Sequence, residues 1–191
     1  IQDEGSQLIS YLTGAKPGMM IFDCCAGGGG KTLHLAALMK NKGVLYAADI
    51  NCKRLENLRE RARRAGADNI RIHQLSENSD NWLKRLAGKM DTVLIDAPCS
   101  GSGVFRRNPD AVWKLSKNSI ISEFPEKQIA LLDKYSRLIK TGGRLVYSTC
   151  SVASSENEQV IAKFLETHNN FQILDAGKIL ADNGINMNFP N

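Results

Sequence analysis

Two cysteines each follow an apolar segment that is typical of a buried strand. Cys99 lies just past the apolar residues of "TVLIDAPCSGSG", and Cys150 lies at the end of "GRLVYSTC". Cysteine is a common small core residue, so either one alone could be inert. Two thiols at the ends of neighbouring strands could instead act as nucleophiles, because the thiolate is the reactive form of cysteine.

The methylation of carbon 5 of a pyrimidine is a reaction that needs a thiol. Carbon 5 is a poor nucleophile, and a thiolate that adds to carbon 6 enables carbon 5 to attack the methyl group of a sulfonium donor. An acid must hold the cytosine edge, and Asp96, at the end of the first apolar segment, is the candidate. A second thiol could assist the loss of the carbon 5 proton, after which the bond to carbon 6 breaks.

Strand-like and helix-like segments alternate along the chain. Apolar segments predict strands over 19–23, 44–49, 70–74, 91–96 and 143–149. Amphipathic patterns predict helices over 31–41, 53–65, 80–87, 125–140 and 155–166. This alternation predicts a doubly wound α/β fold with a mostly parallel sheet. Ligands bind outside the carboxyl ends of the strands in such sheets, and both cysteines map to that edge.

Charged residues on two of these helices are explained by helix formation alone. In the last helix, Ser154 or Ser155 is expected to cap the amino end, with Glu156 and Glu158 favourably placed in the helix dipole. The many arginines of 52–66 favour a solvated helix face over an RNA-binding surface.

A glycine-rich segment, "FDCCAGGGGKT" (22–32), follows the first predicted strand and opens a helix. Glycines let the backbone approach a ligand closely, and the amino end of a helix offers free N–H groups. A P-loop would require glycine where Cys25 stands, and the dinucleotide pattern GxGxxG would require glycine where Thr32 stands. Neither pattern fits.

The remaining interpretation is the adenosylmethionine loop, acidic-x-G-x-G-x-G. Asp23, Gly27 and Gly29 match it, with Cys25 in the first glycine position. Asp49 ends the second predicted strand, where a carboxylate can bind both hydroxyls of a ribose. For Lys31 three roles stay open: a phosphate ligand, an ordinary lysine at a helix start, or a charge that faces the active site.

Length and composition indicate one globular domain over residues 1–191. Hydrophobic residues make up 42% and charged residues 24% of the chain, and no apolar run reaches the roughly 18 residues that span a bilayer. Five cysteines without a CxxC spacing and three histidines argue against a disulfide framework and against a metal site, and favour the cytoplasm. The net charge of +5 suits a polyanionic partner.

Four segments carry a resemblance to a known family. "QDEGSQL" (2–8), "DCCAGGGGKTLHLA" (23–36), "DAPCSGSGVFRRNPD" (96–110) and "YSTCSVASSENE" (147–158) resemble, in order and spacing, the successive motifs of RNA (cytosine-5) methyltransferases of the ribosomal and nucleolar class. DNA cytosine methyltransferases lack the second cysteine, so two cysteine motifs are the signature of the RNA branch. The resemblance implies a class I, Rossmann-like methyltransferase fold, S-adenosyl-L-methionine as cofactor and RNA as partner, with ribosomal RNA favoured over transfer RNA.

The resemblance also implies the role of each site residue. Cys150 is the nucleophile, Cys99 helps to release the product, and Asp96 lies between cofactor and base, with Lys31 included as a further catalytic candidate. The cofactor is contacted by Cys25, Ala26, Gly27, Gly28, Gly29, Gly30, Lys31, Asp49 and Asp96.

The chain departs from the family pattern in three places. Glycines stand where the family motif reads Ala-Pro-Gly, and Ser76, followed by Glu77, stands where an acid near the adenine is common. The last strand with its Gly-Phe-Phe motif and the accessory RNA-binding region are not in 1–191. The chain is therefore expected to be a catalytic core from a longer protein. An RNA-binding domain without catalysis is the alternative that calorimetry with the cofactor would test.

A second basic segment, "FRRNPDAVWK" (105–114), directly follows the first cysteine motif. Arg106 and Arg107 could hold phosphates while the target base is turned out of its stack. Trp113 could be a stacking platform for a base or could anchor the loop on the core, and the sequence leaves both open. The oligomeric state is also left open.

Overall fold

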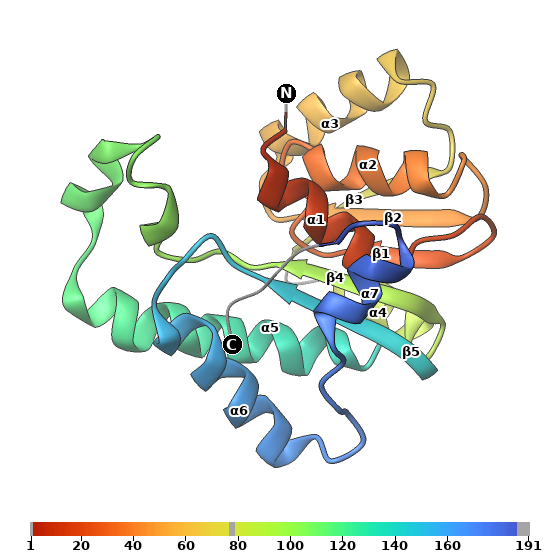
Figure 1. The fold of residues 1–191 in the computed structure, drawn as a ribbon. Coiled ribbons are helices and arrows are strands. Elements are labelled where there is room, and N and C mark those ends of the chain that lie inside the picture. Colours follow the sequence, from red (N-terminus) through yellow and green to blue (C-terminus); the bar gives the residue numbers. More distant parts are fainter. Residues whose placement is uncertain (1, 77–78, 187–191) are drawn as a thin grey trace. The chain divides into compact units, whose positions relative to one another are not determined.

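The computed structural model describes residues 2–76 and 79–186 of the chain (Figure 1). Five strands form one sheet in the order β3-β2-β1-β4-β5. The strands are β1 (Met20–Asp23), β2 (Val44–Asp49), β3 (Ile70–Gln74), β4 (Met90–Asp96) and β5 (Ile139–Ser148). β1 pairs in parallel with β2 and with β4, and β2 pairs in parallel with β3. The predicted parallel α/β sheet is confirmed.

Helices connect the strands within the described part of the chain. The α-helices are α1 (Glu4–Leu12), α2 (Gly30–Leu38), α3 (Cys52–Arg64), α4 (Asp80–Leu86), α5 (Phe124–Ser136), α6 (Glu158–Thr167) and α7 (Ala176–Asp182). Short helical segments are η2 (Ser102–Val104), η3 (Pro109–Lys114), η4 (Ser119–Glu123) and η5 (Ser154–Glu156). None of the helices in the described residues is both long and apolar enough to cross a bilayer.

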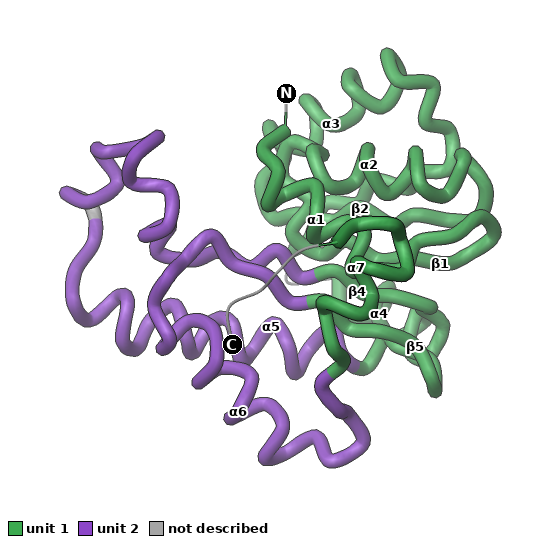
Figure 2. Tube along the Cα trace, in the orientation of Figure 1, with its two compact units in different colours: residues 1–94, 137–146, 174–191 green, residues 95–136, 147–173 purple. Residues whose placement is uncertain are grey.

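The chain divides into two compact units (Figure 2). Unit 1 consists of residues 1–94, 137–146 and 174–191, and unit 2 consists of residues 95–136 and 147–173. β4 and β5 therefore begin in unit 1, and their last two residues belong to unit 2. The expectation of a single domain stays a prediction.

Helices α2 and α3 cover one face of the sheet in unit 1. Ile21 of β1 lies beside Leu45 of β2, and both are completely buried with Leu35 of α2 in one core cluster. Leu55 and Leu58 of α3 pack in a second cluster with Ala47 of β2. Side chains alternate across a strand, so the neighbouring residues of β1 and β2 face the other way.

Aromatic side chains pack on the opposite face. Phe22 of β1 and Tyr46 of β2 lie side by side, with ring centroids 6.3 Å apart. The ring of Trp82 in α4 is 5.8 Å from the ring of Phe22 and stacks on His73 of β3 at 3.8 Å. Helices thus cover both faces, which is the doubly wound arrangement that the sequence predicts.

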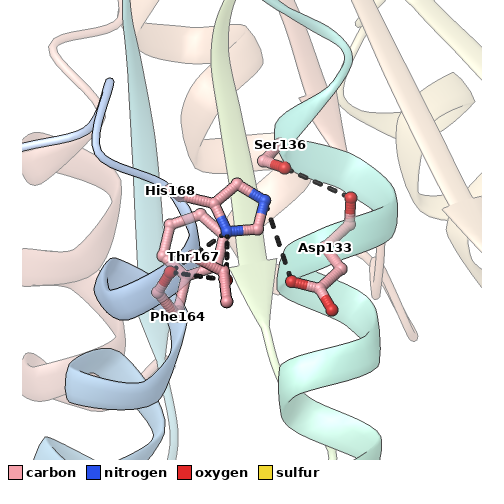
Figure 3. Close-up of polar contacts among 5 residues, drawn as sticks. All are labelled: Asp133, Ser136, Phe164, Thr167 and His168. Atoms are coloured by element: carbon pink, nitrogen blue, oxygen red, sulfur yellow. Dashed lines mark hydrogen bonds and ion pairs between the residues drawn. The ribbon is translucent and has the colours of Figure 1, made fainter.

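In unit 2, a histidine links the end of α6 to α5 (Figure 3). The Nδ1 atom of His168 lies 3.0 Å from the carbonyl oxygen of Phe164 and 2.9 Å from the hydroxyl of Thr167. The imidazole stacks on the ring of Phe164, and its Nε2 atom is 3.8 Å from a carboxylate oxygen of Asp133 in α5. These contacts satisfy the carbonyl group of Phe164 in the last turn of α6 and link α6 to α5.

Several elements differ from the sequence predictions. The helix predicted over 125–140 ends at Ser136, and β5 begins at Ile139 rather than at 143. Gly142 adopts a φ of +75° within β5, so two glycines that read as a break lie inside the strand. Helix α1 was not predicted from the sequence. Its N-cap is Asp3, whose carboxylate accepts the N–H of Ser6 at 3.0 Å.

Candidate active site

The glycine-rich loop of unit 1 connects β1 to α2 through two left-handed glycines. Gly27 has a φ of +52° and Gly29 a φ of +82°, a region that residues with a side chain rarely adopt. A Cβ atom on Gly29 would overlap the side chain of Leu58 in α3, whereas a Cβ atom on Gly27 would meet nothing within 4 Å. Gly29 therefore allows α3 to pack against the loop, and the space at Gly27 is open to a ligand.

Asp49, at the end of β2, holds this loop in place. One oxygen of its carboxylate accepts the N–H of Gly27 at 2.8 Å, and the other accepts the N–H of Asn51 at 2.8 Å. A carboxylate oxygen has two lone pairs, so each oxygen can still accept a hydroxyl hydrogen. The predicted ribose-binding carboxylate and the open backbone at Gly27 thus fit the nucleoside part of adenosylmethionine.

The other residues of the loop make contacts within unit 1. Thr32 donates its hydroxyl hydrogen to the buried carboxylate of Asp23 at 2.7 Å, which fixes the first turn of α2 to the end of β1. The ammonium of Lys31 donates to the hydroxyl of Ser6 in α1 at 3.4 Å. Two further hydrogen bonds hold the backbone of the loop. The N–H of Ala26 donates to the carbonyl oxygen of Ala48, and the guanidinium of Arg61 donates to the carbonyl oxygen of Gly28.

Cys25 occupies the first glycine position of the loop and is half-buried. Its sulfur lies 3.7 Å from that of Cys24, which is almost completely buried. Burial raises the pKa of the Cys24 thiol well above its ordinary value, because a buried thiolate loses its hydration. Cys24 is therefore a core residue, and Cys25 is the cysteine that the loop exposes.

The two cysteines of the predicted catalytic motifs meet in unit 2. The sulfurs of Cys99 and Cys150 lie 3.2 Å apart, and the backbone N–H of Cys150 donates to the sulfur of Cys99 at 3.3 Å. Both cysteines are free thiols, with Cys99 half-buried and Cys150 exposed. The prediction that the two thiols converge is confirmed by this contact.

The environment of Cys99 disfavours its thiolate form. The pKa of its thiol is raised far above the ordinary value by the hydrogen bond to Cys150, by burial and by the negative charge of an ionised Cys150. A thiolate on Cys150 would therefore have a protonated thiol as its neighbour.

Asp96 lies at the end of β4, also in unit 2. Its carboxylate accepts the hydroxyl hydrogen of Ser148 at 2.9 Å, and Ser148 is the last residue of β5. Asp96 is partly exposed, so a second group can reach its carboxylate.

The basic segment predicted to bind RNA follows the Cys99 loop in unit 2. Arg106 and Arg107 are both exposed. Trp113, in η3, is 88% exposed, so the alternative that it anchors the loop on the core is wrong.

Ser76 stands where the family resemblance leads us to expect an acid near the adenine. The N–H of Ser76 donates to the hydroxyl of Ser79 at 2.8 Å, while Glu77 lies outside the described residues. Within residues 2–76 and 79–186, no group of three or more His, Cys, Asp or Glu side chains could hold a metal ion.

The sequence missed one buried charge, the carboxylate of Glu156. Residues 154–156 form the short segment η5, and α6 begins only at Glu158 after the N-cap Asn157. The expected serine cap and the dipole role of Glu156 are therefore wrong. Glu156 is completely buried and accepts hydrogen bonds from residues beside both reactive cysteines. A glutamate inside a "SENE" segment offers no local signal for this burial.

The predicted site residues fall into two sets (Figure 2). Cys25 to Lys31 and Asp49 belong to unit 1. Asp96, Cys99, Arg106, Arg107 and Cys150 belong to unit 2.

Comparison with known proteins gives one consistent family. A family model described as 16S rRNA methyltransferase RsmB/F matches residues 11–188. The chain is 38% identical over 172 residues to the probable ribosomal RNA small subunit methyltransferase B of Synechocystis sp.. That match covers 90% of this chain and 38% of the relative, so the chain spans well under half of the length of the curated protein that it matches.

Solved structures share the fold. The protein PH0851 superposes with a TM-score of 0.81 at 39% identity, over 88% of this chain and 38% of that one. NSun6 from Pyrococcus horikoshii, solved with SFG, superposes with a TM-score of 0.75 at 31% identity, over 86% of this chain and 41% of that one. The sheet and its two helical layers are those of the class I, Rossmann-like methyltransferases, so the predicted fold class is confirmed.

Proposed function

Because the chain belongs to the 16S rRNA methyltransferase RsmB/F family, we propose that it acts as an S-adenosylmethionine-dependent methyltransferase that forms 5-methylcytosine in ribosomal RNA. The observation that carries the proposal is the 3.2 Å contact between the sulfurs of Cys99 and Cys150. A single buried cysteine would be explained by packing, but two free thiols in contact at the ends of two strands match a reaction that uses both.

Cys150 forms the covalent bond to the base in this proposal. Its thiolate adds to carbon 6 of cytosine, and the electron pair moves to carbon 5, which becomes nucleophilic. The greater exposure of Cys150 and the raised pKa of Cys99 both support this assignment. Asp96 holds the cytosine edge and stabilises charge in the activated ring, with its carboxylate oriented by Ser148.

Cys99 acts after the methyl group has been transferred. The proton on carbon 5 leaves, the electron pair forms the carbon 5–carbon 6 double bond, and the bond from carbon 6 to the Cys150 sulfur breaks. The acceptor of that proton is the sulfur of Cys99, which contacts the sulfur of Cys150. Once Cys150 is bonded to carbon 6, the hydrogen bond and negative charge that raise the pKa of Cys99 are gone, so Cys99 can lose its own proton to water. Its thiolate then takes the ring proton as Cys150 departs as a thiolate, which restores the starting state of the pair.

The cofactor would be held by unit 1. Asp49 would accept the ribose hydroxyls, and the loop from Cys25 to Gly30 would lie along the rest of the nucleoside. Lys31 would contribute a positive charge at the start of α2. Adenosylmethionine, when bound, supplies the electrophilic methyl group.

RNA would contact unit 2 beside the thiols. Arg106 and Arg107 would hold phosphates, and Trp113 offers a stacking surface for an unpaired base. The net charge of +5 supports a polyanionic substrate, and a ribosomal RNA substrate supports the cytoplasm as the location.

Bisulfite sequencing of total RNA from cells with and without the gene tests the proposal. We expect one or a few cytosines in small-subunit ribosomal RNA to lose protection when the gene is deleted. Methyl transfer to that RNA by the purified protein should require adenosylmethionine. A change confined to transfer RNA would make transfer RNA the substrate. An unchanged methylation pattern would favour the alternative function, an RNA-binding domain without catalysis.

A further inference from the structure

The carboxylate of Glu156 bridges the two cysteine loops of unit 2. One oxygen accepts the backbone N–H of Ser100 at 2.8 Å, and Ser100 directly follows Cys99. The other oxygen accepts the hydroxyl hydrogen of Ser151 at 2.7 Å, and Ser151 directly follows Cys150. The two oxygens of one carboxylate thus bind the residues that directly follow Cys99 and Cys150.

The charge of Glu156 fixes the direction of a serine network between the loops. A carboxylate only accepts hydrogen bonds, so Ser151 must use its single hydroxyl hydrogen for Glu156. The hydroxyls of Ser100 and Ser102 lie 3.1 Å and 3.0 Å from the Ser151 hydroxyl oxygen, which also accepts the N–H of Ala153 at 3.1 Å. In a hydrogen bond between Ser151 and either of these serines, Ser151 is therefore the acceptor. The Ser102 oxygen in turn accepts the N–H of Val152 at 2.9 Å.

Further bonds close the same frame. The N–H of Gly103 donates to the carbonyl oxygen of Cys150 at 2.9 Å. The amide of Gln128, in α5, donates to Glu156 and to the carbonyl oxygen of Pro98, both at 3.1 Å. The segments on either side of Cys99 are therefore both tied to Glu156, one directly and one through Gln128.

Glu156 is fully buried, yet the three donors to its carboxylate are neutral groups. Burying a carboxylate costs free energy unless its oxygens accept hydrogen bonds. Losing any one of these bonds would leave a buried oxygen without a donor, so the donors must keep their positions. An apolar residue at this position would fill the space without linking the loops.

We infer that Glu156 is a positioning residue that sets the distance between the sulfurs of Cys99 and Cys150. It acts through Ser100 and Ser151, whose N–H and hydroxyl groups donate to its carboxylate. The inference rests on the proposed function only in assigning the thiol pair to catalysis, since the geometry that it explains exists without RNA or cofactor.

A reagent that reports sulfur–sulfur distance gives the direct test. Phenylarsine oxide bridges two nearby thiols, forming two arsenic–sulfur bonds and releasing one water. Protection of Cys99 and Cys150 from alkylation, followed peptide by peptide, measures this bridging in the protein without RNA. The test variant is Glu156→Gln, which keeps the shape but places an N–H donor in the frame.

Two variants serve as controls. Glu158→Gln makes the same change on an exposed residue two positions along. Val160→Ala creates a small cavity at a completely buried residue of α6 and so mimics a loss of stability without touching the serine network.

We expect Glu156→Gln to weaken arsenical bridging by about tenfold or more, because bonds to a charged acceptor are lost or reversed. Both controls should remain within about twofold of the unchanged protein, a difference of a few tenths of a kcal/mol. In methyl transfer, kcat should fall by a similar factor as the bridging affinity, while KM for RNA and for adenosylmethionine changes little.

Unchanged bridging in Glu156→Gln and in Glu156→Ala would overturn the inference, even if both variants were inactive. No bridging in the unchanged protein would also overturn it, as would unfolding of both variants, because the residue would then serve stability alone. Weakened bridging in a protein that shows no methyl transfer would uphold the positioning role and refute the proposed function instead.

Discussion

The sulfurs of Cys99 and Cys150 lie 3.2 Å apart, although the two residues are 51 positions apart in the sequence. Cys150 is the more exposed of the two thiols, and Cys99 is the one whose pKa is raised by their contact. This asymmetry assigns different chemistry to two residues of the same type. It leads to predictions about the thiols, and the glycine loop and Asp49 lead to two more.

Replacing the nucleophile should abolish the reaction without affecting the cofactor. In Cys150→Ala, methyl transfer to RNA should fall below detection, because no other described thiol contacts Cys99. Calorimetry should show unchanged affinity for adenosylmethionine, since the residues proposed to bind it belong mainly to unit 1. Residual transfer at more than a few per cent of the normal rate would assign the nucleophile elsewhere.

Replacing the other thiol should trap the intermediate. In Cys99→Ala, a covalent complex between protein and RNA should accumulate in the presence of adenosylmethionine and survive denaturing electrophoresis. The reason is that Cys150 can still add to the base, whereas release is slowed. If Cys150→Ala trapped the complex and Cys99→Ala did not, the two roles would be reversed.

The raised pKa of Cys99 should be visible in its reactivity. Its folded-state pKa lies above the ordinary value of 9.0, so the thiolate fraction at pH 8 to 9 is reduced and alkylation should be slow. In Cys150→Ala the largest cause of the shift is gone, and Cys99 should react faster at the same pH. Peptide-resolved alkylation rates, with exposed Cys52 as the internal reference, measure the change.

The raised pKa of Cys99 should also make the unfolding free energy depend on pH. A group whose pKa is raised by folding stabilises the fold fully below its ordinary pKa, and this contribution is lost as the pH rises above about 9. Cys99→Ala should therefore flatten the decline in unfolding free energy above that pH. A steeper decline would contradict the assignment.

Two neighbouring glycines should differ strongly in their tolerance of alanine. Gly29→Ala should lower the unfolding free energy by at least about 2 kcal/mol, because it combines a left-handed φ with overlap against Leu58. Gly28→Ala is the matched control and should change it by less than about 0.5 kcal/mol, since its Cβ atom would meet Arg61 only at 3.6 Å. Urea unfolding measures both, and equal effects would refute the packing argument.

Asp49 should be required for cofactor affinity. Asp49→Ala removes the acceptor for two ribose hydroxyls and releases the N–H of Gly27, so the dissociation constant for adenosylmethionine should rise by more than about tenfold. Asp68→Ala, at an exposed carboxylate of the same unit, should leave the constant unchanged. Calorimetry distinguishes the two, and equal affinities would remove Asp49 from the cofactor site.

Local patterns predicted much of this protein correctly. Strand, glycine turn and helix follow one another within a few residues from Asp23 to Lys31, so chain connectivity alone fixes where the loop lies. Parallel pairing then places the end of β2 beside that loop, which is why Asp49 could be predicted at its place. The two cysteines were recognisable because each follows a strand in a distinctive motif.

Other features had no local signal. The start of β5 was missed because Gly142 and Gly143 read as a break, yet both glycines lie inside β5, which is hydrogen-bonded to β4 in the sheet. Glu156 and Glu158 are indistinguishable in the sequence, and only the fold makes one a buried bridge and the other a solvated side chain.

The sequence by itself determined the alternation of strands and helices, the glycine loop with its acid, and the presence of two thiols at strand ends. These depend on interactions between residues that are close along the chain or on a period of the backbone. Only the tertiary structure decided that the two sulfurs touch, that the pKa of Cys99 is raised, and that Glu156 joins their loops. Those properties depend on burial and on distances between segments about fifty residues apart, and no local pattern encodes them.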